Sequence, residues 1–345
     1  MERYMQQRTA PQRPQRRARV RLRDVARAAG VSVSAVSQAL NGYGTISQAT
    51  AERVRKVAAE LAYRPDLLAA SLRRQRTSTL GILTSFLNHP FHSELLAALA
   101  DAATARGFSL LVATAPDEAS GDRQLEQLVD QRCAGVIVFG DRPLPAAARS
   151  GVPVVVLYAE AWTPALGVSA VEVDDRAGVR AATEHLLALG HRRIALVANR
   201  SRPRRAGFED ALRTLGLTPD PALVLELPVR EIEWTAAERL TADLLDRHPD
   251  VSAVVATSDA AAFGVIRGAY LAGRVVPGDL AVVGFDDISL ASTFVPALTT
   301  VRQPIAAIVR EAMGLMDELL HGHEPRSVRL ATELVIRESS GGPRR

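Results

Sequence analysis

The chain has 345 residues, of which 47% are hydrophobic, and it carries a formal net charge of +4 at pH 7. This length suits two or three globular domains. No apolar run reaches the roughly 18 residues of a membrane span, and the first twenty residues are rich in Arg and Gln where a secretory signal would be apolar. We therefore expect a cytoplasmic protein with no membrane role. Because Cys133 is the single cysteine, no intrachain disulfide can form, and we predict that Cys133 is buried and serves only to pack the core.

The basic charge lies at one end of the chain. Residues 1–76 hold 16 Lys and Arg against 5 Asp and Glu, a net charge of +11, whereas the remainder holds 26 against 33, a net charge of −7. This segregation is typical of a polyanion-binding module joined to a neutral or acidic body. Nucleic acid and an anionic membrane surface are the two candidate partners.

Residues 1–20 are predicted to form a disordered basic tail, because Arg, Gln and Pro dominate and little can pack. The tail either adds nonspecific attraction to phosphates or is a solvated extension without function.

Residues 21–64 are predicted to form three short helices. Apolar residues recur with helical spacing from Leu22 and stop at Gly30, Ser32 can cap a second helix, and Ser47 can cap a third after the loop "NGYGT". The outer face of the second helix carries small polar residues, as a helix that enters a major groove requires. The alternative is a generic three-helix bundle, which the charge of +11 disfavours.

Residues 65–76 begin with Pro65 and run through a short apolar stretch into three arginines. We predict a hinge helix or linker, marginal alone because isolated helices of this length rarely persist without packing.

From residue 77 to residue 338, apolar strand-like runs alternate with amphipathic helical stretches. Examples of the strands are "TLGILTSF", "GVIVFG", "PVVVLY", "RIALVAN" and "LAVVGFD". Apolar strands separated by helices indicate parallel sheets covered on both faces, and their number suits two doubly wound sheets. We predict an α/β core with one lobe from residues 77–173 and 302–324, a second lobe from residues 174–301 and 325–338, a ligand cleft between them, and a tail at 339–345.

Several motifs follow one another along the chain. The headpiece holds "LRDVARAAGVSVSAVSQALN", "ISQATAERVRKVAAELAYRP" and "LAASLRR", and the core holds "ATEHLLALGHRRIALVA", "RRAGF", "SDAAAFGVIRGAYLAGRVVPGDLAVVGFDD" and "PALTTVRQP". In this order they resemble the LacI/GalR family of transcriptional regulators. The resemblance covers residues from about 22 to 338 and implies a helix-turn-helix headpiece with a core like that of periplasmic binding proteins.

The resemblance implies a set of residues that contact double-stranded DNA: Ser32, Val33, Ser34, Ser37, Gln38, Asn41, Ser47, Thr50 and Leu72. Gln38 stands where the family usually has an Arg that pairs with guanine, and its amide suits adenine or a less strict contact. The operator is therefore expected to differ from the commonest family half-site. Arg21 stands where a Thr or Ser usually caps the first helix, so that cap is lost or replaced. Leu72 matches a leucine that wedges into the minor groove; the alternative is that it packs on the core.

The resemblance also implies an effector site formed by Phe91, His92, Tyr158, Arg204, Trp234, Ser258 and Asp286. Arg204 and Asp286 would face each other and offer donors and acceptors to vicinal hydroxyls, as a sugar requires. Trp234 would stack on the ligand or belong to the core, and Asp286 would contact the ligand or cap a helix. His92 and Tyr158 depart from the usual ligand set.

The expected function is a homodimeric repressor whose affinity for a palindromic operator is controlled by a sugar effector, without cofactor or metal. Induction and corepression both remain open, as does a regulator responsive to nucleobases. An enzyme is disfavoured because the chain lacks a phosphate-binding loop, a nucleophile elbow and a His-Glu-x-x-His pair. A sugar-binding protein without a DNA role is disfavoured by the basic headpiece.

Overall fold

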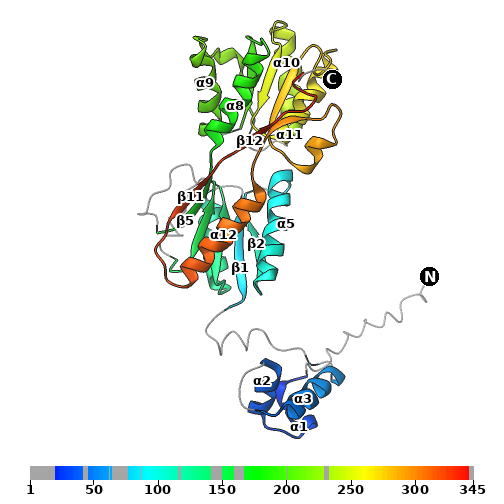
Figure 1. Cartoon of the computed structure of the whole chain (residues 1–345), viewed down its shortest axis with the longest axis vertical. Helices are drawn as coiled ribbons and strands as arrows, with labels where there is room; N and C mark the ends of the chain where they lie inside the picture. Colours follow the sequence, from blue (N-terminus) through cyan, green and yellow to red (C-terminus); the bar gives the residue numbers. More distant parts are fainter. Residues whose placement is uncertain are drawn as a thin grey trace, which may run out of the picture. The chain divides into compact units, whose positions relative to one another are not determined.

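The computed structural model describes residues 20–41, 46–61, 63, 77–85, 87–115, 118–140, 150–158, 167–199, 201–228 and 233–341. The chain divides into two compact units, residues 1–76 and residues 77–345 (Figure 1). Among the described residues, no helix is long and apolar enough to cross a bilayer.

The described residues of the first unit form three helices, α1 (Leu22–Ala29), α2 (Val33–Asn41) and α3 (Gln48–Glu60). Gly30 ends α1 with a left-handed φ of 64°, which glycine adopts without strain, and its N–H bonds back to the last turn. The buried core consists of Val25, Ala26, Ala29, Val36, Ala39, Ala51, Val54 and Ala58. The small size of these residues lets the three helices approach closely.

The second unit has two lobes, each built on a six-stranded sheet. The first lobe contains β1 (Thr79–Thr84), α5 (Pro90–Ala105), β2 (Ser109–Thr114), α6 (Glu118–Asp130), β3 (Gly135–Phe139), β4 (Val154–Leu157), β5 (Ser169–Val173), α12 (Ile305–Leu320) and β11 (Ser327–Leu330). Its strand order is β11-β5-β4-β3-β1-β2, and all neighbours are parallel. Helices α5 and α12 pack on one face, and α6 packs on the other.

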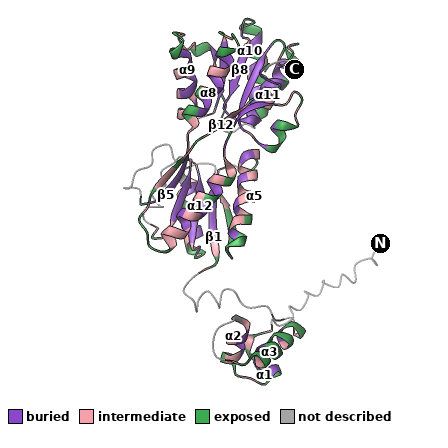
Figure 2. Ribbon diagram, viewed as in Figure 1, coloured by how far each residue is buried: buried purple, intermediate pink, exposed green. Residues whose placement is uncertain are grey.

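The second lobe repeats this plan. It contains α8 (Asp175–Ala188), β6 (Ile194–Ala198), α9 (Arg202–Thr214), η2 (Pro221–Leu223), β7 (Val224–Glu226), α10 (Glu233–Arg247), β8 (Ala253–Ala256), α11 (Asp259–Leu271), β9 (Ala281–Asp286), η3 (Ser289–Ser292), β10 (Thr299–Arg302) and β12 (Glu333–Val335). The strand order is β12-β10-β9-β8-β6-β7. Helices α8 and α9 cover one face, and α10 and α11 cover the other. The interior strands of both sheets are largely buried (Figure 2).

The prediction of two doubly wound sheets is confirmed, with three corrections. Strand β12 is antiparallel to β10, so the second sheet is mixed. Strand β11 pairs with β5 in the first lobe, so the chain returns to the second lobe after Leu330 and the expected boundary at residue 325 is wrong. Ser339 and Ser340, predicted to lie in a tail, are buried, because their hydroxyls bond to β9 and β10. Cys133 is buried as predicted.

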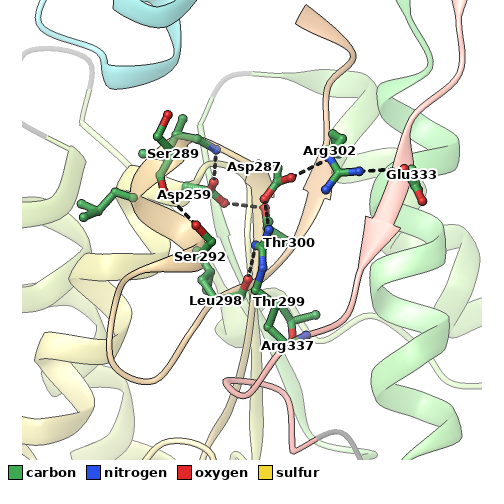
Figure 3. Close-up of polar contacts among 12 residues, drawn as sticks. Asp259, Asp287, Ser289, Ser292, Leu298, Thr299, Thr300, Arg302, Glu333 and Arg337 are labelled. Carbon is green, nitrogen blue, oxygen red and sulfur yellow. Dashed lines mark hydrogen bonds and ion pairs between the residues drawn. The ribbon is translucent and has the colours of Figure 1, made fainter.

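Three segments cross between the lobes, namely β5 to α8, β10 to α12, and β11 to β12. An ion-pair network joins the last two (Figure 3). The carboxylate of Asp287 accepts from Arg302 Nε at 2.7 Å and from Arg337 Nη2 at 2.6 Å, and Arg302 also donates to Glu333 at 3.1 Å. Because Asp287 is largely buried and pairs with two guanidinium groups, it fixes the end of β9 relative to the crossing segments.

Candidate functional site

The outer face of α2 is exposed and bears short side chains. Val33 is 45% exposed, and Ser32 and Ser34 are also exposed, while Ser37 and Gln38 lie half-buried. Val36 and Ala39 point into the core of the unit, so the polar face is turned away from it. The helix therefore has the shape and polarity that entry into a major groove requires.

Two of the predicted DNA-contacting hydroxyls also cap helices. Ser32 Oγ accepts from Ala35 N at 3.1 Å at the start of α2. Ser47 Oγ accepts from Thr50 N at 3.3 Å and lies 2.9 Å from Thr50 Oγ1 at the start of α3. Capping orients these exposed hydroxyls next to helix N-termini, where anions are favoured.

The expected loss of the usual cap on α1 has a visible substitute. The carboxylate of Asp24, on the third residue of the helix, accepts from Arg21 N at 2.8 Å. This is one half of a capping box, and the acidic group also complements the helix dipole.

Some predicted elements lie outside the described residues. These are the tail at 1–19, the segment 65–76 with Leu72, and the side chain of Asn41. Their assignments remain predictions from the sequence.

The second candidate site lies at the carboxyl ends of strands from both lobes. Tyr158 follows β4, Asp175 comes shortly after β5, Ser258 follows β8, and Asp286 ends β9. The carboxyl ends of parallel strands are where open α/β sheets bind ligands.

Arg204 is the buried cation of this site. It is 8% exposed, and its guanidinium faces Asp175, with Nε 3.1 Å from Oδ2 and Nη2 3.2 Å from Oδ1. Nη1 donates to Thr257 O at 2.6 Å and lies 3.8 Å from Asp286 Oδ1, and the guanidinium carbon lies 3.8 Å from the ring centre of Phe285. Arg204 is thus held by the protein itself, in a close ion pair with one hydrogen bond to Asp175 and in a cation–π contact.

Asp286 is the buried acid of this site, and only one of its two carboxylate oxygens has a hydrogen-bond partner among the described residues. Oδ1 accepts from Gln303 Nε2 at 2.6 Å, whereas Oδ2 is buried and has no hydrogen-bond partner among the described residues. None of its described hydrogen bonds caps a helix. Burial raises the pKa of Asp286 to about 6, although Arg204 and His89 act to lower it. Its φ of 127° is rare for a residue with a side chain, and such strained conformations concentrate at functional sites.

The first lobe contributes aromatic groups. Tyr158 has a left-handed φ of 66°, and its hydroxyl is buried without a partner among the described residues. Burial, together with Asp286 and Asp175, raises the pKa of this phenol well above its usual value. The ring of Phe91 is buried 6.1 Å from that of Tyr158, and the ring of His92 lies 5.6 Å from that of Phe139.

The two remaining predicted residues lie at the N-termini of α10 and α11. Trp234 is 41% exposed, so the alternative that it belongs to the core is wrong. Ser258 caps α11 by accepting from Ala261 N at 3.0 Å, and its hydroxyl donates to Glu233. Glu233 in turn lies 3.5 Å from Nε2 of His89 in the other lobe.

Four polar residues of this site were not predicted from the sequence: His89, Asp175, Glu233 and Gln303. Asp175 follows Asp174 directly after an apolar strand, and Gln303 follows β10. Their positions at the carboxyl ends of strands could therefore have predicted that both belong to the ligand site. His89 and Glu233 begin helices in different lobes, and nothing in their local sequence indicates that they meet.

The comparisons with known proteins agree with this architecture. Residues 21–66 match the family described as "Bacterial regulatory proteins, lacI family", and residues 183–340 match the "Periplasmic binding protein-like domain". A helix-turn-helix unit joined to such a core defines a DNA-binding transcriptional regulator.

Individual relatives narrow this class to a family. The "HTH-type transcriptional regulator CelR" of Thermobifida fusca is 35% identical over 341 residues, covering 94% of this chain and 99% of that protein. The "Ribose operon repressor" of Escherichia coli (strain K12) is 34% identical over 312 residues, covering 87% and 92%. The chain belongs to the lacI family of bacterial regulatory proteins.

Two solved structures resemble most of the chain. The "transcriptional regulator CelR-cellobiose complex" has a TM-score of 0.69 at 33% identity and covers 93% of this chain and 100% of that one. The Lac repressor dimer bound to operator and the anti-inducer ONPF has a TM-score of 0.83 at 27% identity and covers 93% and 99%.

The raised pKa of Asp286 predicts a pH effect on stability. Because its pKa is about 6 in the folded protein and about 3.9 in an unfolded chain, the folded state holds this proton more tightly, and ionisation reduces stability as the pH rises through that window. Asp286→Asn cannot ionise. Between pH 4 and pH 7 its free energy of unfolding should therefore rise relative to wild type, by on the order of 2 kcal/mol.

Urea unfolding at several pH values measures this difference. Asp243→Asn, on the exposed face of α10, is the control and should differ from wild type by a constant amount. A difference between Asp286→Asn and wild type that does not change with pH would contradict the assignment.

Proposed function

We propose that this chain is a homodimeric repressor whose affinity for a palindromic operator is controlled by a sugar. Ser32, Val33, Ser34, Ser37 and Gln38 on α2 read the bases, with Asn41, Ser47 and Thr50 on bases or phosphates. A dimer requires a palindrome, since each headpiece meets an equivalent half-site. In this function the chain has no catalytic role. The protein acts in the cytoplasm, where the DNA lies.

The observation that carries the effector part is the group of buried polar atoms left without partners. Among the described residues they include Tyr158 OH, Asp286 Oδ2, Gln303 Oε1 and His89 Nδ1. Unpaired buried polar atoms are costly, so a ligand that satisfies them gains affinity. Hydroxyl groups both donate and accept, which suits this mixture. The cellobiose complex of the similar CelR structure supports a sugar.

Fluorescence anisotropy with labelled duplexes tests the proposal. The purified dimer should select one palindromic duplex from a randomised pool, and addition of cellobiose, ribose or a related sugar should change that affinity. Release of the operator would indicate induction, and tighter binding would indicate corepression. No preference for a palindromic duplex over random DNA at any salt concentration would refute the DNA part.

The role of Gln38 makes a separate prediction about base preference. Gln38→Arg should favour guanine at the base pair that Gln38 meets and weaken the parent operator about tenfold or more, because a bidentate contact discriminates by about 1–3 kcal/mol. Ala59→Arg adds the same charge to an exposed position on α3 and should strengthen all duplexes alike. Equal effects of the two variants on every duplex would rule out base reading by Gln38.

A further inference from the structure

Glu233 and His89 meet across the two lobes. Glu233 is the first residue of α10 in the second lobe, and His89 precedes α5 in the first lobe. Glu233 Oε2 lies 3.5 Å from His89 Nε2 and also accepts from the hydroxyl of Ser258. The side chains are 25% and 17% exposed, so the pair is shielded from bulk water.

The surroundings of the pair shift the pKa values of both partners toward their charged forms. Burial alone would lower the pKa of His89, but Glu233 and Asp286 outweigh burial and raise it. Burial alone would raise the pKa of Glu233, but His89, Ser258 and Arg204 outweigh burial and lower it. Both shifts favour an imidazolium facing a carboxylate.

The described charged groups of the effector site include one more acid than base. Asp175, Glu233 and Asp286 are the acids, and Arg204 and His89 are the bases; Asp175 enters this set through its ion pair with Arg204. Each base already faces an acid, so neither offers an uncompensated positive charge. An anionic ligand group would meet this excess of carboxylates at low local dielectric.

Two of the four unpartnered atoms named above indicate the same preference, whereas Tyr158 OH and His89 Nδ1 can donate to a hydroxyl or to an anion. Asp286 Oδ2, when ionised, and Gln303 Oε1 only accept, so they require donors from the ligand. A hydroxyl supplies a donor, whereas an ionised phosphate oxygen supplies none.

We propose that Glu233 and His89 are specificity-determining residues of the effector site and select an uncharged polyhydroxy ligand over its phosphorylated counterpart. Glu233 repels the anion, and His89 limits that repulsion so that the carboxylate is tolerated beside a neutral ligand. The inference rests on the proposed function, since it concerns the same effector site.

Opposite charge changes in the two residues test the proposal. Calorimetric titration of the full-length protein uses matched probes: glucose and glucose 6-phosphate, ribose and ribose 5-phosphate, cellobiose and its 6-phosphate. Wild type should bind its preferred neutral sugar at least about tenfold more tightly than the phosphorylated form. Glu233→Gln should reduce this ratio about tenfold, because it removes one negative charge. His89→Gln should increase the ratio, because it leaves Glu233 uncompensated.

A purely structural role would move the ratio in the same direction, or not at all, in both variants, because both lose one contact. Asp243→Asn, an exposed acid on the same helix, and His321→Gln, an exposed histidine, are the matched controls and should keep the wild-type ratio within about twofold. Thermal melting verifies that each variant is folded; if one is not, the direction of the change in the other decides.

The outcomes separate this inference from the proposed function. Ratios that stay within about twofold of wild type in both variants, or a wild-type preference for the phosphorylated sugar, overturn the inference and leave a sugar-responsive regulator intact. Failure of wild type to bind any of the six probes overturns the sugar assignment and the inference together.

Discussion

Arg204→Ala is expected to abolish the response to the effector while leaving operator binding intact. Removal of the guanidinium leaves Asp175 and Asp286 in a buried site without their cation. Breaking a buried ion pair from one side costs about 3–5 kcal/mol. We therefore expect at least a hundredfold loss of effector affinity and a clearly lower melting temperature of the core, measured by calorimetric titration and thermal unfolding.

The neighbouring residue provides the control. Arg205 makes surface pairs with Glu209 and Glu226, and Arg205→Ala should change stability by no more than about 1 kcal/mol. Arg204→Lys keeps a charge but loses the planar guanidinium that bonds to Asp175 and Thr257 together, so it should fold better than Arg204→Ala while still binding the effector weakly. If the operator affinity of Arg204→Ala still changes at the ligand concentration to which wild type responds, the site assignment fails.

Gly207→Ala is expected to destabilise the second lobe by about 3 kcal/mol. Gly207 lies on α9 where this helix packs against α8, and a Cβ placed there would lie 2.2 Å from the backbone oxygen of Arg176 and 3.0 Å from the backbone nitrogen of Arg180. Backbone atoms cannot rotate away, so the two helices would have to separate, and overpacking of this kind costs about 1–3 kcal/mol or more. Urea unfolding measures the loss.

Gly314→Ala is the matched control for this substitution. Gly314 also lies within a helix, α12, but a Cβ there meets no atom within 4 Å. Alanine should stabilise that helix by up to about 1 kcal/mol, because it is a better helix former than glycine. Similar stabilities of the two variants would show that α8 and α9 can separate without cost.

The headpiece could be predicted from local sequence because each of its signals acts over a few residues. Gly30 ends α1, Ser32 and Ser47 cap the helices that follow, and apolar residues at helical spacing supply the core. The cap on α1 was the exception. Its substitute, Asp24, satisfies the backbone from within the helix, a pattern that depends on side-chain direction.

The strands of the core were predictable where they form buried apolar runs, and three short, half-exposed edge strands were missed. Strands β1, β3, β4, β6, β8 and β9 lie in the interior of the sheets and read as apolar runs. Strands β7, β11 and β12 have three or four residues at sheet edges, where a half-exposed strand has no continuous apolar pattern. This explains the misplaced boundary at residue 325.

The sequence by itself determined the segregation of basic charge, the helix-turn-helix, the two-lobed α/β class and the family, because these depend on composition, periodicity and motifs in order. Only the tertiary structure decided that Arg204 forms an ion pair with Asp175, that Asp286 has one carboxylate oxygen without a partner among the described residues, and that His89 lies next to Glu233. These pairs join residues from about 30 to more than 140 positions apart. The distance between the partners and their burial set the pKa values of these groups, and both arise only when folding brings the carboxyl ends of the strands together.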